Sequence, residues 1–562
     1  MEKFAVVTLA TLLVAGTMPA PVHAANPGGG APTATPIKHL VVIYQENVSF
    51  DHYFGTYPFA TNPKGEPAFF AKPGTPTVNN LLGSGLLTSN PNALNSENGA
   101  GATNPFRLDR SQAATADQDH DYTPEQKAFD RGLMDAFPAS VGTGDTSAVK
   151  NAGSAPAIAD TTGLTMGYFD GNTVTAYWNY AQRYAMSDNF YGTNFGPSTD
   201  GAVNLISGQL NGVIEDKNPG GSTIDDSNGG LTLISDADPF GDTCSTTTGE
   251  TVRFGGKNIG DLLNAEGVSW GWFEGGFNLK LTNSNGTTGC KRSTTSAVTG
   301  VTEGDYIQHH EPFQYYASTA NLTHARPSSV SNIGFTDAAN HQYDINDFFD
   351  ALSAGNLPSV SYLKAPGFED GHAGYSDPLD EQNFVVTVIN ALQKSPDWNS
   401  TAVIISYDDS DGWYDHQQSP IMNQSATAAD IVAGQPSCGT GANALPGALG
   451  APHAQGRCGY GPRLVLLAVS PWAKSNFVDH TITDQTSILR FVEDNWLKGK
   501  RIGDGSFDVL AGPLDSMFDF TREGDGGTFV LNPSTGLPEQ NGRGGNGYGN
   551  GGYGNNNNDR GW

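Results

Sequence analysis

The segment TAVIISYDDSDGWYDH, residues 401–416, predicts both how this chain folds and where its chemistry lies. Residues 402–407 are β-favouring and mostly apolar, which indicates a buried strand. Asp408 and Asp409 follow at once, and Asp411 lies two residues further on. Adjacent carboxylates repel each other, so a bound cation is the simplest reason to place them side by side. The segment therefore predicts a buried strand that ends in a metal site.

Short apolar segments and helical patterns alternate along the rest of the chain. This alternation is typical of an α/β fold in which a mostly parallel central sheet carries helices on both faces. The predicted strands span residues 40–44, 268–274, 359–364, 402–407 and 464–469. The predicted helices span residues 173–184, 200–207, 346–354, 380–394 and 485–496. Residues 219–251 and 424–457 look like long loop-rich insertions.

Polar side chains follow three of the predicted strands. Glu46 and Asn47 come after the first strand, Asp370 and His372 after the strand at 359–364, and Asp408 with Asp409 after the strand at 402–407. In a parallel sheet, sites form beyond the carboxyl ends of the strands. We therefore expect these groups to meet at one edge of the sheet.

Glu46, Asn47, Asp408 and Asp409 offer only oxygen ligands. Such a set suits one hard divalent ion, such as Ca²⁺, Mg²⁺ or Mn²⁺, and leaves open which of them binds. The alternative is that Glu46 and Asn47 form an exposed turn while the two aspartates cap a helix.

A glycine-proline turn, FGPSTDGA at residues 195–202, opens one of the predicted helices. Ser198 should lie at or just before the helix N-terminus, where backbone N–H groups favour an anion. A hydroxyl in this place could attack a phosphorus atom whose oxygens rest on those N–H groups. The simpler interpretation is that Ser198 or Thr199 only caps the helix.

Three histidine segments could add cationic groups to such a site. Acidic residues surround His120 and His372, so we expect raised pKa values for both. The doublet His309–His310 is the third candidate. A cationic imidazole can hold phosphate oxygens and protonate a leaving group, which would favour an acidic pH optimum. Any single histidine is, however, more often structural.

The composition limits the partners and the compartment. The formal charge is −29, from 29 Lys and Arg against 58 Asp and Glu, which argues against nucleic acid and against charge-driven binding to anionic membranes. Residues 1–24 resemble a signal peptide, with an apolar core over 4–16, and 25–35 resemble a linker. Residues 541–562 are Gly/Asn-rich with no aliphatic side chain, so we expect disorder there.

The four cysteines agree with export to the periplasm or the medium. None forms a Cys-x-x-Cys pair, which argues against a zinc ribbon. Two bonds between sequence neighbours, Cys244–Cys290 and Cys438–Cys458, would fit an oxidising compartment. Free thiols in a reducing cell are the alternative.

Five motifs occur together and in order: ENVSFDHYFG at 46–55, GPST at 196–199, HHEPFQYY at 309–316, EDGH at 369–372 and YDDSDG at 407–412. In these motifs the chain resembles the bacterial phosphoesterase family of secreted acid phosphatases and phospholipases C, within the alkaline-phosphatase-like superfamily. The similarity runs over roughly residues 36–520. It implies a catalytic domain over 36–522, followed by an extension over 523–562.

The resemblance also implies roles for individual residues. Ser198 matches the nucleophile position, which forms a phosphoserine intermediate. The metal ligands of the family match Glu46, Asn47, Asp408 and Asp409, and its phosphoryl-contacting histidines match His120, His310 and His372.

Residues 199–204 and 408–412 depart from the phospholipase pattern, so the chain looks closer to the acid phosphatases. Sequence therefore favours an acid phosphatase that hydrolyses phosphate monoesters. The alternatives are a phospholipase C acting on phosphatidylcholine-type lipids and a non-catalytic surface-binding protein. No stable insertion into the membrane is expected.

Overall fold

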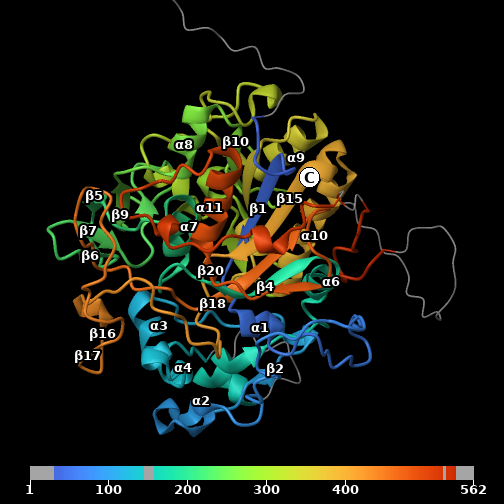
Figure 1. Cartoon of the computed structure of the whole chain (residues 1–562), viewed down its shortest axis with the longest axis vertical. Coiled ribbons are helices and arrows are strands. Elements are labelled where there is room, and N and C mark those ends of the chain that lie inside the picture. The colour runs from blue at the N-terminus through green and yellow to red at the C-terminus, as the bar shows by residue number, and fades with distance from the viewer. Residues whose placement is uncertain (1–30, 145–156, 523, 525–526, 540–562) are drawn as a thin grey trace, which may run out of the picture. The chain divides into compact units, whose positions relative to one another are not determined.

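The computed structural model describes residues 31–144, 157–522, 524 and 527–539. All of these belong to the unit that begins at Ala31 (Figure 1). The expected signal peptide, most of the expected linker and the Gly/Asn-rich tail lie outside the described residues. Within the described part of the chain, no helix combines the length and the apolar character needed to cross a membrane.

A nine-stranded sheet forms the centre of the fold. Its order is β13-β10-β14-β1-β15-β18-β4-β19, and β20 also pairs with β4. The strands are β1 (His39–Gln45), β4 (Ala185–Tyr191), β10 (Trp270–Glu274), β13 (Gln342–Asp344), β14 (Val360–Lys364), β15 (Thr401–Tyr407), β18 (Arg463–Val469), β19 (Phe477–Asp479) and β20 (Thr483–Asp484). Among these strands, β18 alone runs antiparallel to its neighbours. The prediction of a mostly parallel sheet is confirmed.

The sheet forms where the sequence supplies apolar, β-branched side chains. Strands β1, β14, β15 and β18 are buried over almost their whole length. Burial on both faces requires a cover of helices, and continuous apolar strands are the expected sequence signature of it.

Two groups of helices flank the sheet (Figure 1). One group contains α7 (Ser198–Ser207), α8 (Ile259–Glu266) and α11 (Gln485–Trp496), in which α7 packs against the other two. The other contains α6 (Thr175–Arg183) and α10 (Pro378–Lys394), while α9 (Ile345–Ser353) packs against β10. All five predicted helices are therefore present, with ends that move by at most two residues.

Shorter elements surround this core. The other α-helices of the described residues are α1 (Phe50–Phe54), α2 (Pro91–Leu94), α3 (Tyr122–Phe129) and α4 (Phe137–Ser140), and short 3-10 turns lie between them. Small sheets are built by β2 (Phe106–Arg107), β3 (Gly167–Tyr168), β5 (Val213–Lys217), β6 (Thr223–Asp225), β7 (Leu231–Leu233), β8 (Asp238–Pro239), β9 (Thr251–Phe254), β11 (Ser293–Thr295), β12 (Thr302–Gly304), β16 (Ile431–Val432) and β17 (Gln435–Pro436). The predicted insertions contain only short elements: β6 to β8 and the first residue of β9 in one, and β16, β17 and a 3-10 turn (Ala428–Asp430) in the other.

Both cysteine pairs are bonded as the local pairing predicted. Cys244 joins Cys290, and Cys438 joins Cys458. The described residues hold no free cysteine. The alternative of free thiols is therefore wrong for this structure.

Candidate active site

The carboxyl ends of three parallel strands bring the predicted residues together. β1 lies between β14 and β15, and Gln45 at the end of β1 is in register with Tyr407 at the end of β15. The next residues along the chain are therefore Glu46 on one strand and Asp408 on its neighbour. This places the two carboxylates side by side at the edge of the sheet, as the sequence predicted.

A buried cluster of oxygen atoms forms at this edge. Ser198 Oγ lies 2.9 Å from Glu46 Oε2 and 3.1 Å from Asp409 Oδ2. One atom of the Asn47 amide lies 2.6 Å from Glu46 Oε2, 2.7 Å from Asp408 Oδ1 and 3.3 Å from Asp409 Oδ2. Each of these five side chains is at most 3% exposed. We call Glu46, Asn47, Asp408 and Asp409 the oxygen cluster.

The oxygen cluster fits a hard divalent ion. Three carboxylates and one amide are its only side chains, and oxygen ligands of this kind suit such ions. If the amide oxygen of Asn47 faces the carboxylates, only acceptors meet there, and a cation is needed to hold them together. The described residues also include carboxylate–histidine groups that could hold a metal ion, among them Glu46 with His310 and Asp370.

Local structure explains why Ser198 reaches the cluster. α7 begins at Ser198, so its first turn presents backbone N–H groups beside the hydroxyl. Gly201 lies in that turn, and a Cβ atom added there would be 2.1 Å from the carbonyl oxygen of Asp408. The helix can therefore lie against the end of β15 only because residue 201 has no side chain.

The three predicted histidines all border the oxygen cluster. His120 Nε2 lies 3.4 Å from Asn47 Nδ2, and His372 Nε2 lies 3.2 Å from the Asn47 amide. His310 Nδ1 lies 3.3 Å from Glu46 Oε1. Its neighbour His309 is instead half-buried beside Asp236 and Asp238, at 3.9 and 4.0 Å. Of the doublet, the structure thus places His310 in the cluster.

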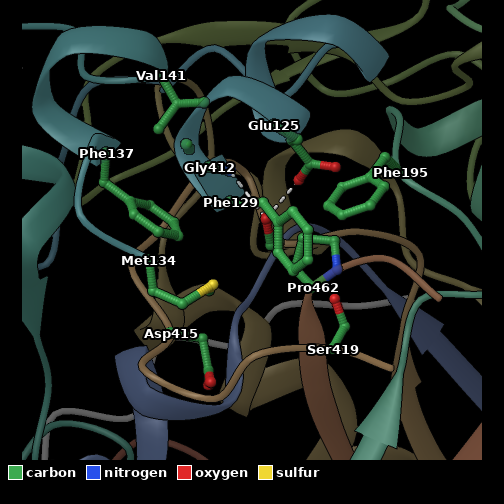
Figure 2. A pocket seen from close by; sticks show the side chains of 12 residues that line it. Glu125, Phe129, Met134, Phe137, Val141, Phe195, Gly412, Asp415, Ser419 and Pro462 are labelled. Carbon is green, nitrogen blue, oxygen red and sulfur yellow. Dashed lines mark hydrogen bonds between the residues drawn. The ribbon is translucent and has the colours of Figure 1, made fainter. Parts of the chain in front are cut away.

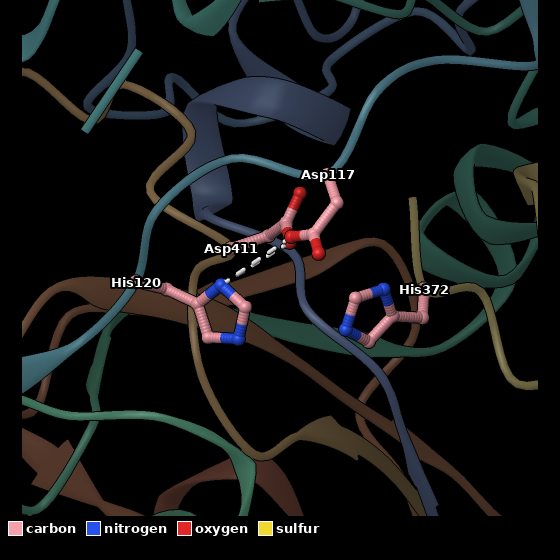
Figure 3. A group of neighbouring side chains, drawn as sticks. All are labelled: Asp117, His120, His372 and Asp411. Atoms are coloured by element: carbon pink, nitrogen blue, oxygen red, sulfur yellow. Dashed lines mark ion pairs between the residues drawn. The ribbon is translucent and has the colours of Figure 1, made fainter. Parts of the chain in front are cut away.

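Asp117 and Asp411 lie beside His120, and His372 lies on their other side (Figure 3). His120 Nδ1 lies 2.8 Å from the Gln118 carbonyl oxygen, 3.5 Å from Asp411 Oδ1 and 3.7 Å from Asp117 Oδ1. Asp411 is fully buried, and Asp117 reaches solvent. Asp117, His120, His372 and Asp411 lie close enough together to form another group able to bind a cation.

The histidines differ in charge. Burial alone would lower the pKa of His120, but Asp409, Asp411 and Asp117 outweigh it and raise that pKa well above its usual value. Burial lowers the pKa of His372, and it lowers the pKa of His310 strongly with help from Lys364. The expectation of a raised pKa is therefore right for His120 and wrong for His372. Both rings are buried, and they differ in their neighbours: three carboxylates raise the pKa of His120, whereas the charge of His120 opposes the effect of Asp117 and Asp408 on His372.

Sequence reasoning missed Lys364. It ends β14, its side chain is 0% exposed, and its ammonium group contacts Glu46 Oε1 and, at 2.8 Å, Asp408 Oδ2. Burial would lower the pKa of Lys364, but the carboxylates of Asp408 and Glu46 raise it. The only available signal was its position at the carboxyl end of a strand next to β1.

Glu125 is a second residue that the sequence did not reveal. It lies in α3, and its carboxylate accepts hydrogen bonds from Gly196 N at 2.9 Å and from Ser410 Oγ at 2.6 Å. Gly196 belongs to the turn before Ser198, and Ser410 follows Asp409. Burial, together with the charge of Asp409, raises the pKa of Glu125 to about 8. Glu125 therefore ties the two turns of the site together.

Behind these turns lies a small, mainly apolar pocket (Figure 2). Glu125 points into it from one side, and the rings of Phe129, Phe137 and Phe195 form much of its wall. The other lining residues are Ala128, Met134, Val141, Ser410, Gly412, Asp415, Ser419 and Pro462. Neither Ser198 nor any oxygen-cluster residue lines it, so this pocket is separate from the site.

Acidic side chains lie around His120, His309 and the start of α7. Asp117, Asp119 and Asp121 are exposed, and Asp236 and Asp238 are half-buried. Asp236 accepts hydrogen bonds from Thr199 N and Oγ1, so it lies next to the start of α7. We call these five aspartates the acidic rim. Within the described part of the chain, none of them forms an ion pair with Lys or Arg.

Comparison with known proteins decides the family. The family model described as "Phosphoesterase family" matches residues 37–497. The chain belongs to the phosphoesterase family. Its members hydrolyse phosphoric ester bonds, and the resemblance predicted from the five motifs is confirmed.

Several relatives carry phospholipase C names. The chain is 26% identical to "Non-hemolytic phospholipase C" of Burkholderia pseudomallei, over 82% of this chain and 55% of that protein. It is 22% identical to "Hemolytic phospholipase C" of Pseudomonas aeruginosa, over 91% and 59%. It is 23% identical to "Phospholipase C B" of Mycobacterium tuberculosis, over 86% and 78%. The chain thus spans little more than half the length of the first two. A solved structure of murine ectonucleotide pyrophosphatase / phosphodiesterase 5 matches 62% of this chain with a TM-score of only 0.28.

Proposed function

We propose that this protein is a metal-dependent phosphodiesterase of the phospholipase C type that uses Ser198 as nucleophile. The single observation that carries the proposal is the position of Ser198 Oγ. It lies at the N-terminus of α7 and within hydrogen-bond distance of both Glu46 and Asp409. A capping serine alone would not need two buried carboxylates as partners.

The reaction follows from what each side chain contacts. Ser198 gives its proton to one of the two carboxylates that it contacts and attacks phosphorus. The bond from phosphorus to the leaving alcohol breaks, so that the phosphoryl group, with its remaining substituent, is joined to Ser198. Backbone N–H groups at the start of α7 and the imidazoles of His120, His310 and His372 face the phosphoryl oxygens and stabilise their charge. His120, which keeps a proton because its pKa is raised, gives it to the departing alcohol. Water then attacks phosphorus and returns one proton to His120, and Ser198 recovers its proton from the carboxylate as the phosphoryl group leaves.

The oxygen cluster would hold one divalent ion. When bound to Glu46, Asn47, Asp408 and Asp409, the ion would lower the pKa of the nearby serine hydroxyl and withdraw negative charge from the phosphoryl group. The family does not identify the metal, and the oxygen ligands favour Ca²⁺, Mg²⁺ or Mn²⁺.

The acidic rim supports a substrate that carries a positive group beside its phosphate. Five carboxylates around His120, His309 and the start of α7 would repel a dianionic monoester and attract a head group such as phosphocholine. The phospholipase C names of the relatives point the same way. This reverses the preference that the sequence gave to the acid phosphatases.

An acid phosphatase remains the second candidate because of one observation. Residues 408–412 read DDSDG, which departs from the phospholipase pattern, and Asp411 in this turn is buried beside His120. The negative charge of Asp411 helps to raise the pKa of His120, so that its imidazole stays protonated. A protonated imidazole suits a dianionic monoester.

One pair of assays separates the two candidates. Hydrolysis of a chromogenic phosphocholine diester is compared with hydrolysis of the matching phosphate monoester, each with and without a chelator. We expect faster turnover of the diester, loss of both activities with the chelator, and release of phosphocholine from phosphatidylcholine vesicles. Turnover of the monoester alone would favour the acid phosphatase, and activity on neither ester would contradict both.

The acidic rim can be tested separately. Replacing Asp119 and Asp121 by asparagine should raise KM for the phosphocholine diester and lower it for the monoester. Glu266→Gln, on the exposed end of α8, provides the control. Equal changes for both esters would show that the rim does not select the head group.

We also propose export. The leader-like residues 1–24, the two disulfides and the acidic composition support it. Expression in a bacterial host, followed by N-terminal sequencing of the protein outside the cytoplasm, should give a mature chain that begins at Ala25. Retention of the full-length chain in the cytoplasm would contradict the proposal.

A further inference from the structure

A buried lysine occupies one side of the oxygen cluster. The side chain of Lys364 is 0% exposed, as are those of Glu46 and Asp408, which its ammonium group contacts. The ammonium also lies 5.6 Å from the centre of the Tyr44 ring. A buried charge is costly unless it is paired, so contact with two carboxylates accounts for its presence.

In each of the two carboxylates, one oxygen contacts Lys364 and the other faces the oxygen cluster. Glu46 turns Oε1 to Lys364 and Oε2 to Ser198. Asp408 turns Oδ2 to Lys364 and Oδ1 to the Asn47 amide. The ammonium group therefore binds one oxygen of each residue, Glu46 Oε1 and Asp408 Oδ2, which we call the outer oxygens. The other two, Glu46 Oε2 and Asp408 Oδ1, face the oxygen cluster.

Charge counting agrees with this division. Glu46, Asp408 and Asp409 bring three negative charges when they are ionised, and Lys364 brings one positive charge. The neighbouring His120 and Asp411, 3.5 Å apart, carry opposite charges that cancel each other. One divalent ion then makes the group neutral. Two divalent ions beside the lysine would leave a net positive charge, buried away from water, which is unfavourable.

We propose that the ammonium group of Lys364 takes the place of a second metal ion, so that the site binds a single divalent ion. This inference rests on the metal-dependent site proposed above. Lys364 acts here as a positioning residue: it fixes the rotation of the Glu46 and Asp408 carboxylates and occupies the position between their outer oxygens. Enzymes with two metal ions place them about 3.5–4 Å apart, a distance that two shared carboxylates could span.

The test counts metal ions. The full chain is stripped with a chelator, dialysed against Mn²⁺, and its bound manganese is measured by mass spectrometry. We expect one ion per chain in the wild type and in Lys364→Arg, and two in Lys364→Ala, which loses the positive charge and opens its place. Lys257→Ala, at an exposed lysine, should bind one ion like the wild type.

Electron paramagnetic resonance shows where the second ion binds. Two neighbouring Mn²⁺ ions interact magnetically, so Lys364→Ala should give the spectrum of a coupled pair, and the wild type that of an isolated ion. Two ions in the wild type, or one in the folded Lys364→Ala variant, would overturn the inference. An additional uncoupled ion in the variant would do the same.

The outcomes also separate this inference from the proposed function. No bound Mn²⁺ in the wild type would refute the metal site itself, whereas two bound ions would refute only the role of Lys364. If Lys364→Ala fails to fold by circular dichroism, Lys364→Gln is used with the same expected count. Glutamine is neutral and of similar length, so it preserves the packing around β14.

Discussion

Gly201 sets the distance between the nucleophile and the carboxylates, and a single methyl group should disturb it. A Cβ atom at residue 201 would lie 2.1 Å from Asp408 O and 2.6 Å from Asp408 C. Ordinary contacts are longer by roughly 1 Å or more. Because the clash is with backbone, the start of α7 must move by about that amount in Gly201→Ala.

This movement should separate Ser198 from its partners. The contact between Ser198 Oγ and Asp409 Oδ2, now 3.1 Å, would lengthen to about 4 Å, beyond hydrogen-bond range. Misplacement of a reacting group by about 1 Å can reduce the rate ~100-fold. Overpacking of this kind usually lowers the free energy of unfolding by only about 1–3 kcal/mol. We therefore expect a folded protein with kcat reduced about 100-fold.

The assay compares kcat on the chromogenic diester with unfolding in urea. Gly304→Ala is the matched control, because a Cβ atom there meets only Tyr306 O, at an ordinary 3.4 Å. The control should retain both activity and stability. Wild-type kcat in a folded Gly201→Ala protein would refute the reasoning, since the site would then tolerate the displacement of α7.

Three further changes test other parts of the site. Ser198→Ala should abolish turnover and leave the folded structure intact, and no phosphorylated chain should be found by mass spectrometry after an acid quench. Glu125→Ala leaves the Gly196 N–H and the Ser410 hydroxyl without their partner. The free energy of unfolding should therefore fall by about 1–3 kcal/mol for each lost hydrogen bond. Glu125→Gln, which matches the protonated acid, should behave like the wild type below pH 8. Burial raises the pKa of Glu381 from 4.5 to about 7, so the folded chain keeps a proton that the unfolded chain loses in this range. Glu381 should therefore contribute a fall in stability of up to roughly 3 kcal/mol as the pH rises from 4.5 to 7, and Glu381→Gln should remove that contribution in urea unfolding.

Sequence correctly predicted those strands and helices in which the pattern of apolar residues matches the residues that are buried. β1, β14 and β15 are apolar segments that end abruptly in polar residues, so their position, direction and shared edge all followed from the pattern. The start of α7 followed from its glycine-proline turn. These residues are governed by local preferences that the fold does not override.

β4 escaped prediction because its polar residues hide the strand pattern. It reads AMSDNFY, and Ser187 and Asp188 interrupt the apolar run. In the structure both are buried and satisfied: Asp188 pairs with His480, and its carbonyl oxygen accepts a hydrogen bond from Arg463. These partners lie more than 270 positions away along the chain. The local sequence gives no indication that this segment forms a strand of the main sheet.

Lys364 shows the same limit at the site itself. A lysine at a strand end usually extends into water, and sequence alone gives no reason to expect another placement. Its burial depends on Glu46, 318 positions earlier, and on Asp408, 44 positions later. The sequence predicted a metal site from Glu46 and Asp408. It did not show that the Lys364 ammonium already neutralises part of their negative charge. The number of bound ions, unlike the type of ligand, follows only from the three-dimensional arrangement, because it depends on the sum of charges that the fold collects in one place.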